Sequence, residues 1–125
     1  MRLNINTVSS KIYRQIVEVM RSIPPLDTLR NRDLDVLAVL MYYNYKYKTV
    51  EETLRWRIIN SSTTRREMEK DINMTEDTFN NNMSHIRKAG LLDKDNKIPN
   101  FLQVLLSGDK YEVVFNFNIK NEDEL

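Results

Sequence analysis

The chain has 125 residues, a formal charge of +1, no cysteine and one histidine, His85. A chain of this length is expected to form one domain, and 41% apolar residues suffice for its core. The missing cysteines exclude disulfides, and together with the lone histidine they exclude Cys/His metal sites, so neither a metal nor a cofactor is expected. No apolar run approaches the roughly 20 residues of a membrane span. We therefore expect a cytoplasmic protein without a membrane partner.

Two helices are predicted in the first part of the chain. Residues 8–20 place apolar side chains at helical spacing, and Pro24 and Pro25 end that segment. Residues 31–43 carry apolar side chains on two sides, which is typical of a central core helix. The tyrosines and lysines of residues 41–48 allow two interpretations. They close the core at a helix end, or they present rings for stacking on bases or on a partner.

Two capping boxes predict the next helices. Thr49 and Glu52 are spaced so that the hydroxyl and the carboxylate each satisfy a free amide at the start of a helix that runs to about residue 60. Thr64 and Glu67 repeat this spacing and predict a short helix over residues 65–72.

A longer helix is predicted over residues 76–89. Thr75 is a good N-cap, and Met74 is placed to pack on Phe79 as a hydrophobic staple. Gly90 ends the helix, because glycine adopts the left-handed conformation at low cost. The apolar face of this helix contains Phe79, Met83 and Ile86, which we expect to be buried.

The remaining segments alternate between turns and extended structure. Residues 91–98 are predicted to form a small charged hairpin. Pro99 suits the start of a further short helix that Gly108 closes. Residues 111–119 alternate apolar and polar side chains, which predicts a half-buried strand. Because a lone strand leaves backbone groups unpaired, we expect it to pair with residues 3–5 or with a neighbouring subunit.

Two short helices, a glycine and a charged hairpin in this order resemble the winged helix-turn-helix superfamily. The run Arg32-Asp33-Leu34-Asp35-Val36-Leu37 is similar to the helix that precedes the motif in MarR-like regulators, and Lys88-Ala89-Gly90-Leu91-Leu92 to their exit into the wing. The resemblance covers roughly residues 31–98, and it implies a helix-turn-helix at about 64–90 and a wing at about 91–98. With the C-terminal β-strand predicted at about 111–119, we expect a single winged-helix-like domain over residues 1–125, mainly α with a small β component.

The resemblance also implies that helix 76–89 enters the major groove of double-stranded DNA. Asparagine pairs with adenine, and Arg or Lys pairs with guanine or phosphate. The candidate nucleic-acid-binding residues are Thr63, Arg65, Arg66, Asn80, Asn81, Ser84, His85, Arg87, Lys88, Lys94 and Lys97. Glu76 and Asp77 depart from the pattern because they repel phosphate. A solvated face of an Asn-rich helix explains Asn80 to Asn82 equally well, and solubility explains the interleaved basic and acidic residues.

Two function hypotheses remain open. The first is a DNA-binding winged-helix protein that regulates transcription or replication. The alternative is a non-enzymatic structural or assembly protein of a phage virion, which uses the same fold for contacts with a homo-oligomer or a virion partner. The near-neutral charge, the apolar C-terminal strand and the acidic end at residues 121–125 favour the alternative. With no Gly-rich phosphate loop and no visible nucleophile-base pair, an enzyme is not expected.

Overall fold

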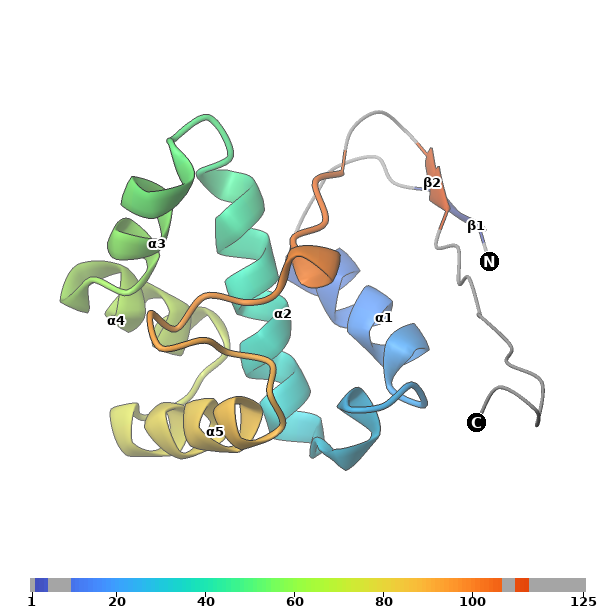
Figure 1. Ribbon diagram of the computed structural model, residues 1–125, viewed down its shortest axis with the longest axis horizontal. Helices are drawn as coiled ribbons and strands as arrows, with labels where there is room; N and C mark the ends of the chain where they lie inside the picture. The colour runs from blue at the N-terminus through green and yellow to red at the C-terminus, as the bar shows by residue number, and fades with distance from the viewer. Residues whose placement is uncertain (1, 5–9, 107–109, 113–125) are drawn as a thin grey trace, which may run out of the picture.

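The computed structural model describes residues 2–4, 10–106 and 110–112, and the description that follows is confined to them. Within these ranges the chain forms five α-helices, two short 3₁₀ helices and one pair of three-residue strands (Figure 1). None of these helices is both long enough and apolar enough to cross a membrane.

The first helix packs on one side of a central helix. α1 (Ser10–Met20) buries Tyr13, Ile16 and Val17, as its helical spacing predicts. The 3₁₀ helix η1 (Leu26–Thr28) then leads into α2 (Asn31–Lys46), which lies in the middle of the molecule with α1 on one side and α3 to α5 on the other (Figure 1). The predicted central core helix is therefore confirmed.

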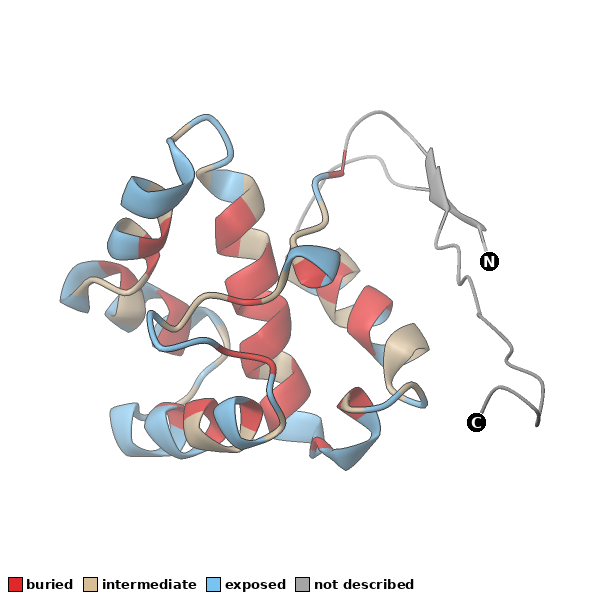
Figure 2. Cartoon of the chain, viewed as in Figure 1, coloured by how far each residue is buried: buried red, intermediate tan, exposed pale blue. Residues whose placement is uncertain are grey.

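The core follows α2 along its length (Figure 2). Eight of its side chains from Leu34 to Tyr43 are apolar or aromatic and buried, which confirms that this helix is covered on both sides. Tyr43 is only 2% exposed, while Tyr42, Tyr45 and Tyr47 are partly buried and pack against the core. The tyrosines thus close the core at this helix end, because their rings cover its apolar side chains.

Three shorter helices complete the helical body: α3 (Glu52–Ile59), α4 (Ser62–Asp71) and α5 (Glu76–Lys88). Both predicted capping boxes are wrong. Glu51 caps α3, because its carboxylate accepts from the amides of Thr53 at 2.9 Å and Leu54 at 3.0 Å. Ser61 caps α4, three residues before the predicted cap Thr64.

The predicted wing is wrong. Residues 91–98 form a turn without strands, although Leu91, Leu92 and Ile98 are buried. The Asp93 carboxylate accepts from the amides of Asp95 at 2.8 Å and Lys97 at 3.0 Å, so the Lys97 amide is not available for a strand ladder. Two backbone bonds close the turn: the Asp93 amide donates to the Lys97 carbonyl at 3.1 Å, and the Asn96 amide donates to the Asp93 carbonyl at 3.0 Å.

The C-terminal part also differs from the winged-helix pattern. The helix predicted from Pro99 to Gly108 is reduced to the 3₁₀ helix η2 (Asn100–Leu102), followed by irregular chain to residue 106. The backbone leaves helical geometry at Gln103, whose side chain donates to the Ile98 carbonyl at 2.9 Å. Gly108 lies outside the described residues.

The two described strands join the ends of the chain. β1 (Arg2–Asn4) pairs antiparallel with β2 (Lys110–Glu112), with Leu3 opposite Tyr111. The predicted strand over residues 111–119 is thus described only at its first two residues, and 113–119 lie outside the described part. This pair lies apart from α3 to α5 (Figure 1) and supplies neither a wing nor a strand beside one. The winged-helix fold class is therefore wrong, and the described body is an assembly of five helices.

Candidate nucleic-acid interface

The turn between α4 and α5 is defined by local hydrogen bonds. Asn73 takes the left-handed conformation at a φ of 52°, and the Met74 amide donates back to the Glu69 carbonyl at 2.8 Å. This is the Schellman pattern, in which a left-handed residue satisfies the last carbonyls of a helix. Thr75 then caps α5, because its hydroxyl oxygen accepts from the Thr78 amide at 3.2 Å. Two separate helices with a short turn are thus confirmed.

α5 also ends at a left-handed residue that caps the helix. Gly90 has a φ of 82°, and the Leu91 amide donates to the Ile86 carbonyl at 3.1 Å. The predicted glycine cap is confirmed. Leu91 is buried, as the apolar residue after such a cap usually is.

The inner face of α5 is buried against α2 and α4. Phe79, Met83 and Ile86 are at most 2% exposed, and Met74 packs against the same core. The guanidinium carbon of Arg65 lies over the Phe79 ring, 5.1 Å from its centre. The predicted helical phase of α5 is therefore confirmed, and it leaves the opposite face turned outward.

A buried carboxylate joins the N-terminus of α2 to α5. Asp33 is 1% exposed and accepts from the backbone amide of Arg30 at 2.9 Å. Its other oxygen accepts from the Asn82 side-chain amide at 2.6 Å and lies 3.3 Å from Nδ1 of His85. These three contacts orient Asn82 and His85, so the two helices keep a defined spacing at this point.

Arg32 holds the same helix end against the α4–α5 turn. It donates to the carbonyls of Ile72 at 3.0 Å and Asn73 at 3.3 Å, and to the Asp35 carboxylate at 2.6 Å. The Arg32 guanidinium is therefore engaged in hydrogen bonds within the protein. The turn and the N-terminus of α2 form one rigid corner.

An open cavity of about 840 Å³ lies between this corner and the outer face of α5. None of its lining residues carries a carboxylate. They are Arg30, Asn31, Arg32, Thr78, Asn81, Asn82, Ser84, His85 and Lys88. The surface is thus cationic and rich in hydrogen-bond donors, which suits an anion better than a cation. No three His, Asp or Glu residues in the described part of the chain are placed to hold a metal ion.

The chain matches no family model, no curated protein and no solved structure.

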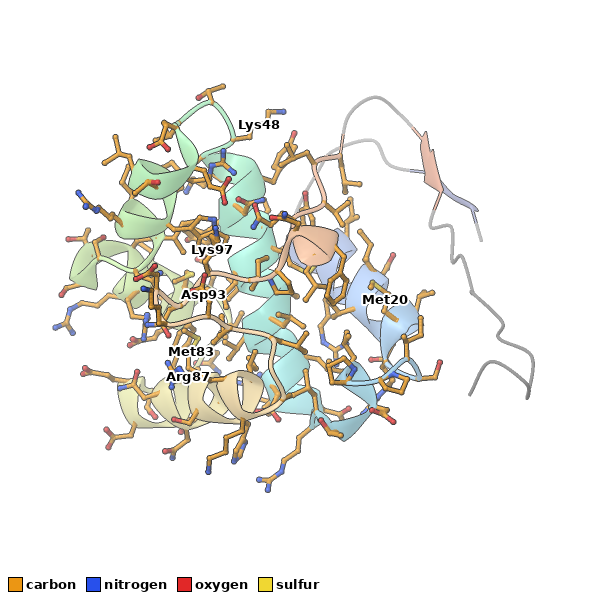
Figure 3. The ribbon with its side chains drawn as sticks, in the orientation of Figure 1. Met20, Lys48, Met83, Arg87, Asp93 and Lys97 are labelled. Carbon is orange, nitrogen blue, oxygen red and sulfur yellow. The ribbon has the colours of Figure 1, made fainter. Side chains whose placement is uncertain are left out.

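Several predicted site residues are used inside the protein. Arg65 donates to Asn60 and Asn80, and burial lowers the pKa of its guanidinium. Arg87, on the last turn of α5, donates to Asn96 in the 91–98 turn (Figure 3). Lys97 bonds Glu52 at 2.7 Å, and this hydrogen bond raises the pKa of the lysine. These side chains fix the turn and the helices, so they are poorly placed as free phosphate contacts.

Other predicted residues point outward. Asn81 and Lys88 are exposed and line the cavity together with the partly buried Ser84 and His85. Thr63, Arg66 and Lys94 are exposed but lie outside the cavity lining. The structure therefore gathers four of the predicted residues, all from α5, and leaves the others apart.

Sequence reasoning missed the α2 side of the cavity. Arg30, Asn31 and Arg32 line it, and so do Thr78 and Asn82 of α5. The only local indication was that two arginines flank an asparagine where a helix starts. This pattern did not predict a binding site, because a helix start alone explains it. The contact that makes the cavity joins residues 49 positions apart, Asp33 and Asn82.

Proposed function

We propose that the chain binds duplex DNA through the outer face of α5, as a regulator of transcription or replication. The observation that carries this proposal is the stripe Asn81, Ser84 and Lys88 on α5, which opens onto the cationic cavity. These positions are three and four residues apart and so share one helix face. An amide, a hydroxyl and an ammonium group on such a face are the groups that contact base edges and phosphates.

The charge along α5 supports contact near its C-terminal half. Glu76 and Asp77 occupy the first turn, whereas Arg87 and Lys88 occupy the last. Phosphates are repelled by the first pair and attracted by the second, in which Lys88 is the candidate for direct contact because Arg87 is bonded to Asn96. The proposed interface is therefore centred on Asn81 to Lys88 and on the neighbouring N-terminus of α2.

The test is fluorescence anisotropy with a labelled duplex of random sequence, over a series of salt concentrations. We expect a dissociation constant of about 10⁻⁴ to 10⁻⁶ M near physiological salt, weakening as salt rises. Lys88→Gln should reduce the slope of log affinity against log salt by about one, because one phosphate contact is lost. Asn81→Ala should cost about 1–3 kcal/mol at particular base positions of a selected site and little on random duplex.

Lys48→Gln is the matched control. Lys48 lies beyond the other end of α2, far from α5 (Figure 3), and its loss changes the net charge by the same amount. Equal effects of Lys48→Gln and Lys88→Gln would show a general charge effect and reject the interface. Absence of binding up to about 100 μM at low salt would reject DNA binding itself.

A second candidate is a protein–protein assembly module. Phe101 and Leu105 lie close together in the sequence and are 53% and 52% exposed, which is unusual for large apolar side chains. The C-terminal strand gives little support for assembly, because β2 pairs with β1 of the same chain and not with a neighbouring subunit. Sedimentation of the wild type and of Phe101→Ser/Leu105→Ser tests this candidate. A larger species that only the wild type forms would favour it.

A further inference from the structure

We propose that the cavity between the N-terminus of α2 and α5 binds one phosphate group, held by Arg30 and Lys88. This inference rests on the proposed function for its partner, in which the phosphate belongs to the DNA backbone. The phosphate chemistry itself rests on the cavity.

Two positively charged side chains that have no partner in the described part of the chain line the cavity. Arg30 is the N-cap residue directly before α2, Lys88 lies on the last turn of α5, and both are exposed. Neither side chain has a hydrogen bond or an ion pair with any other described residue, whereas Arg32 beside them is bonded to Asp35. Two cations without partners among the described residues, one at the N-cap of α2 and one at the end of α5, therefore border one space. Like charges repel, so an anion between them lowers the energy of both.

The neutral lining fits the same ligand. Thr78, Asn81 and Ser84 provide hydroxyl and amide donors along α5, and phosphate oxygens accept such bonds. Guanidinium groups match phosphate with two parallel hydrogen bonds, while an ammonium group acts as a point charge. The cavity thus combines charge with several directed donors.

The wall behind these residues is rigid. The contacts of Asp33 with Asn82 and His85, and of Arg32 with the α4–α5 turn, join the two helices from 40 to 52 residues apart in the chain. The backbone at residues 30 and 88 is therefore held in place, while the exposed side chains of Arg30 and Lys88 are ordered only when a ligand binds. A preformed site loses less conformational freedom on binding than a site that must first assemble.

The experiment has two arms. In the first, the ¹⁵N-labelled chain is titrated with inorganic phosphate against sodium chloride at matched ionic strength, and amide shifts are recorded by NMR. We expect phosphate-specific shifts at residues 30–32, 78, 81, 84 and 88. In the second arm, duplex affinity is measured for Arg30→Gln, Lys88→Gln and the double variant, with Lys48→Gln as control.

We expect Arg30→Gln and Lys88→Gln each to weaken both phosphate and duplex binding. In the double variant the losses should be less than additive, because both side chains contact the same phosphate. Arg30 is the N-cap residue of α2, so its effect on DNA cannot arise from the face of α5 alone. Arg30→Lys should keep more of the affinity than Arg30→Gln, because it retains the positive charge. If Arg30 had only a structural role, the two variants would bind equally.

The outcomes separate this inference from the proposed function. Phosphate shifts without duplex binding would support the cavity, with a free phosphate compound as its ligand, and reject the DNA proposal. Duplex binding that is unaffected by Arg30→Gln, with no phosphate-specific shifts, would reject the cavity and leave the DNA proposal intact. Fully additive losses would also overturn it, since the two cations would then contact different groups.

Discussion

Arg65 illustrates how a charged residue can belong to the core of a small helical protein. Its guanidinium covers the Phe79 ring and donates to Asn60 at 3.3 Å and to Asn80 at 3.1 Å. Long basic side chains often bury their stems on apolar surface in this way. The half-buried arginine of α4 thus connects the C-cap of α3 with α5, and it forms part of the packing around Phe79.

Phe79→Ala should lower the free energy of unfolding by about 3–5 kcal/mol, because a fully buried ring is removed and its cavity remains. Urea denaturation followed by circular dichroism measures the loss. Asn81→Ala, at an exposed position of the same helix, should change stability by less than about 0.5 kcal/mol. Equal midpoints for Phe79→Ala and the wild type would contradict the packing described for α5.

Tyr43 is a second residue whose properties the fold changes, in this case the pKa of its hydroxyl. Its hydroxyl donates to the Asp71 carboxylate at 2.5 Å. Burial raises the pKa of Tyr43, and the hydrogen bond to Asp71 raises it further. The folded state therefore favours the protonated phenol more strongly than the unfolded chain does.

Stability should consequently fall in alkaline solution. The contribution of Tyr43 is complete below the pKa of an unfolded tyrosine, about 10, and is lost as pH rises above it. We expect the free energy of unfolding to decline from about pH 10 upward, and Tyr43→Phe to show a smaller decline. Tyr45→Phe serves as control. Identical pH profiles for Tyr43→Phe and the wild type would exclude this contribution.

At the scale of the elements, two left-handed residues set the path of the chain. Asn73 turns the backbone between α4 and α5, and Gly90 turns it from α5 into the 91–98 turn. That turn is then attached to α3, because the Asn60 side-chain amide donates to the carbonyls of Asp95 at 3.1 Å and Asn96 at 3.4 Å. Side-chain bonds to the backbone hold this segment where a winged helix would use a strand ladder.

Gly90→Ala tests the cost of the left-handed cap. A Cβ at this position would meet no atom within 4 Å, so only the backbone conformation opposes it. We expect a loss of about 1–2 kcal/mol in the free energy of unfolding. Asn73→Gly should be neutral or slightly stabilising, because glycine adopts the same conformation freely. Full stability of Gly90→Ala would indicate that α5 ends in another way.

The caps show what local sequence reasoning resolves at this scale. Thr75 and Gly90 were predicted correctly because each acts on the backbone within a few residues. Thr49 and Thr64 matched a capping box equally well, but Glu51 and Ser61 hold the caps. Thr64 is instead buried within α4 and makes a 3.1 Å hydrogen bond with the Ser61 hydroxyl. Tertiary packing selects between adjacent polar residues that are locally equivalent.

At the scale of the whole molecule, charge is unevenly distributed along the chain. Residues 10–106 contain 16 Lys and Arg against 13 Asp and Glu, whereas Glu122, Asp123 and Glu124 lie together at the C-terminus. A near-zero net charge thus conceals a basic helical body. On the DNA proposal, the acidic end weakens the long-range attraction between protein and phosphates.

Deleting residues 121–125 should therefore strengthen binding to random duplex at low salt, because the net charge rises from +1 to +4. The gain should shrink as salt increases, since the Debye length falls to about 10 Å at 0.1 M. A variant with Glu122, Asp123 and Glu124 changed to glutamine controls for chain length. Anisotropy curves that coincide with the wild type at low salt would exclude this effect.

The sequence by itself determined the helical phases of α1, α2 and α5, the break at Asn73 and the cap at Gly90, because each depends on side-chain periodicity or on backbone preferences within one turn. The 91–98 segment and the α2 side of the cavity were decided only in the tertiary structure. Asp93 takes amides that a hairpin needs, and Asn60 reaches across from α3 to hold the turn. Arg30 borders the same cavity as the face of α5 because Asp33 and Asn82 pair between the two helices, and no local pattern specifies a contact between residues so distant in the chain.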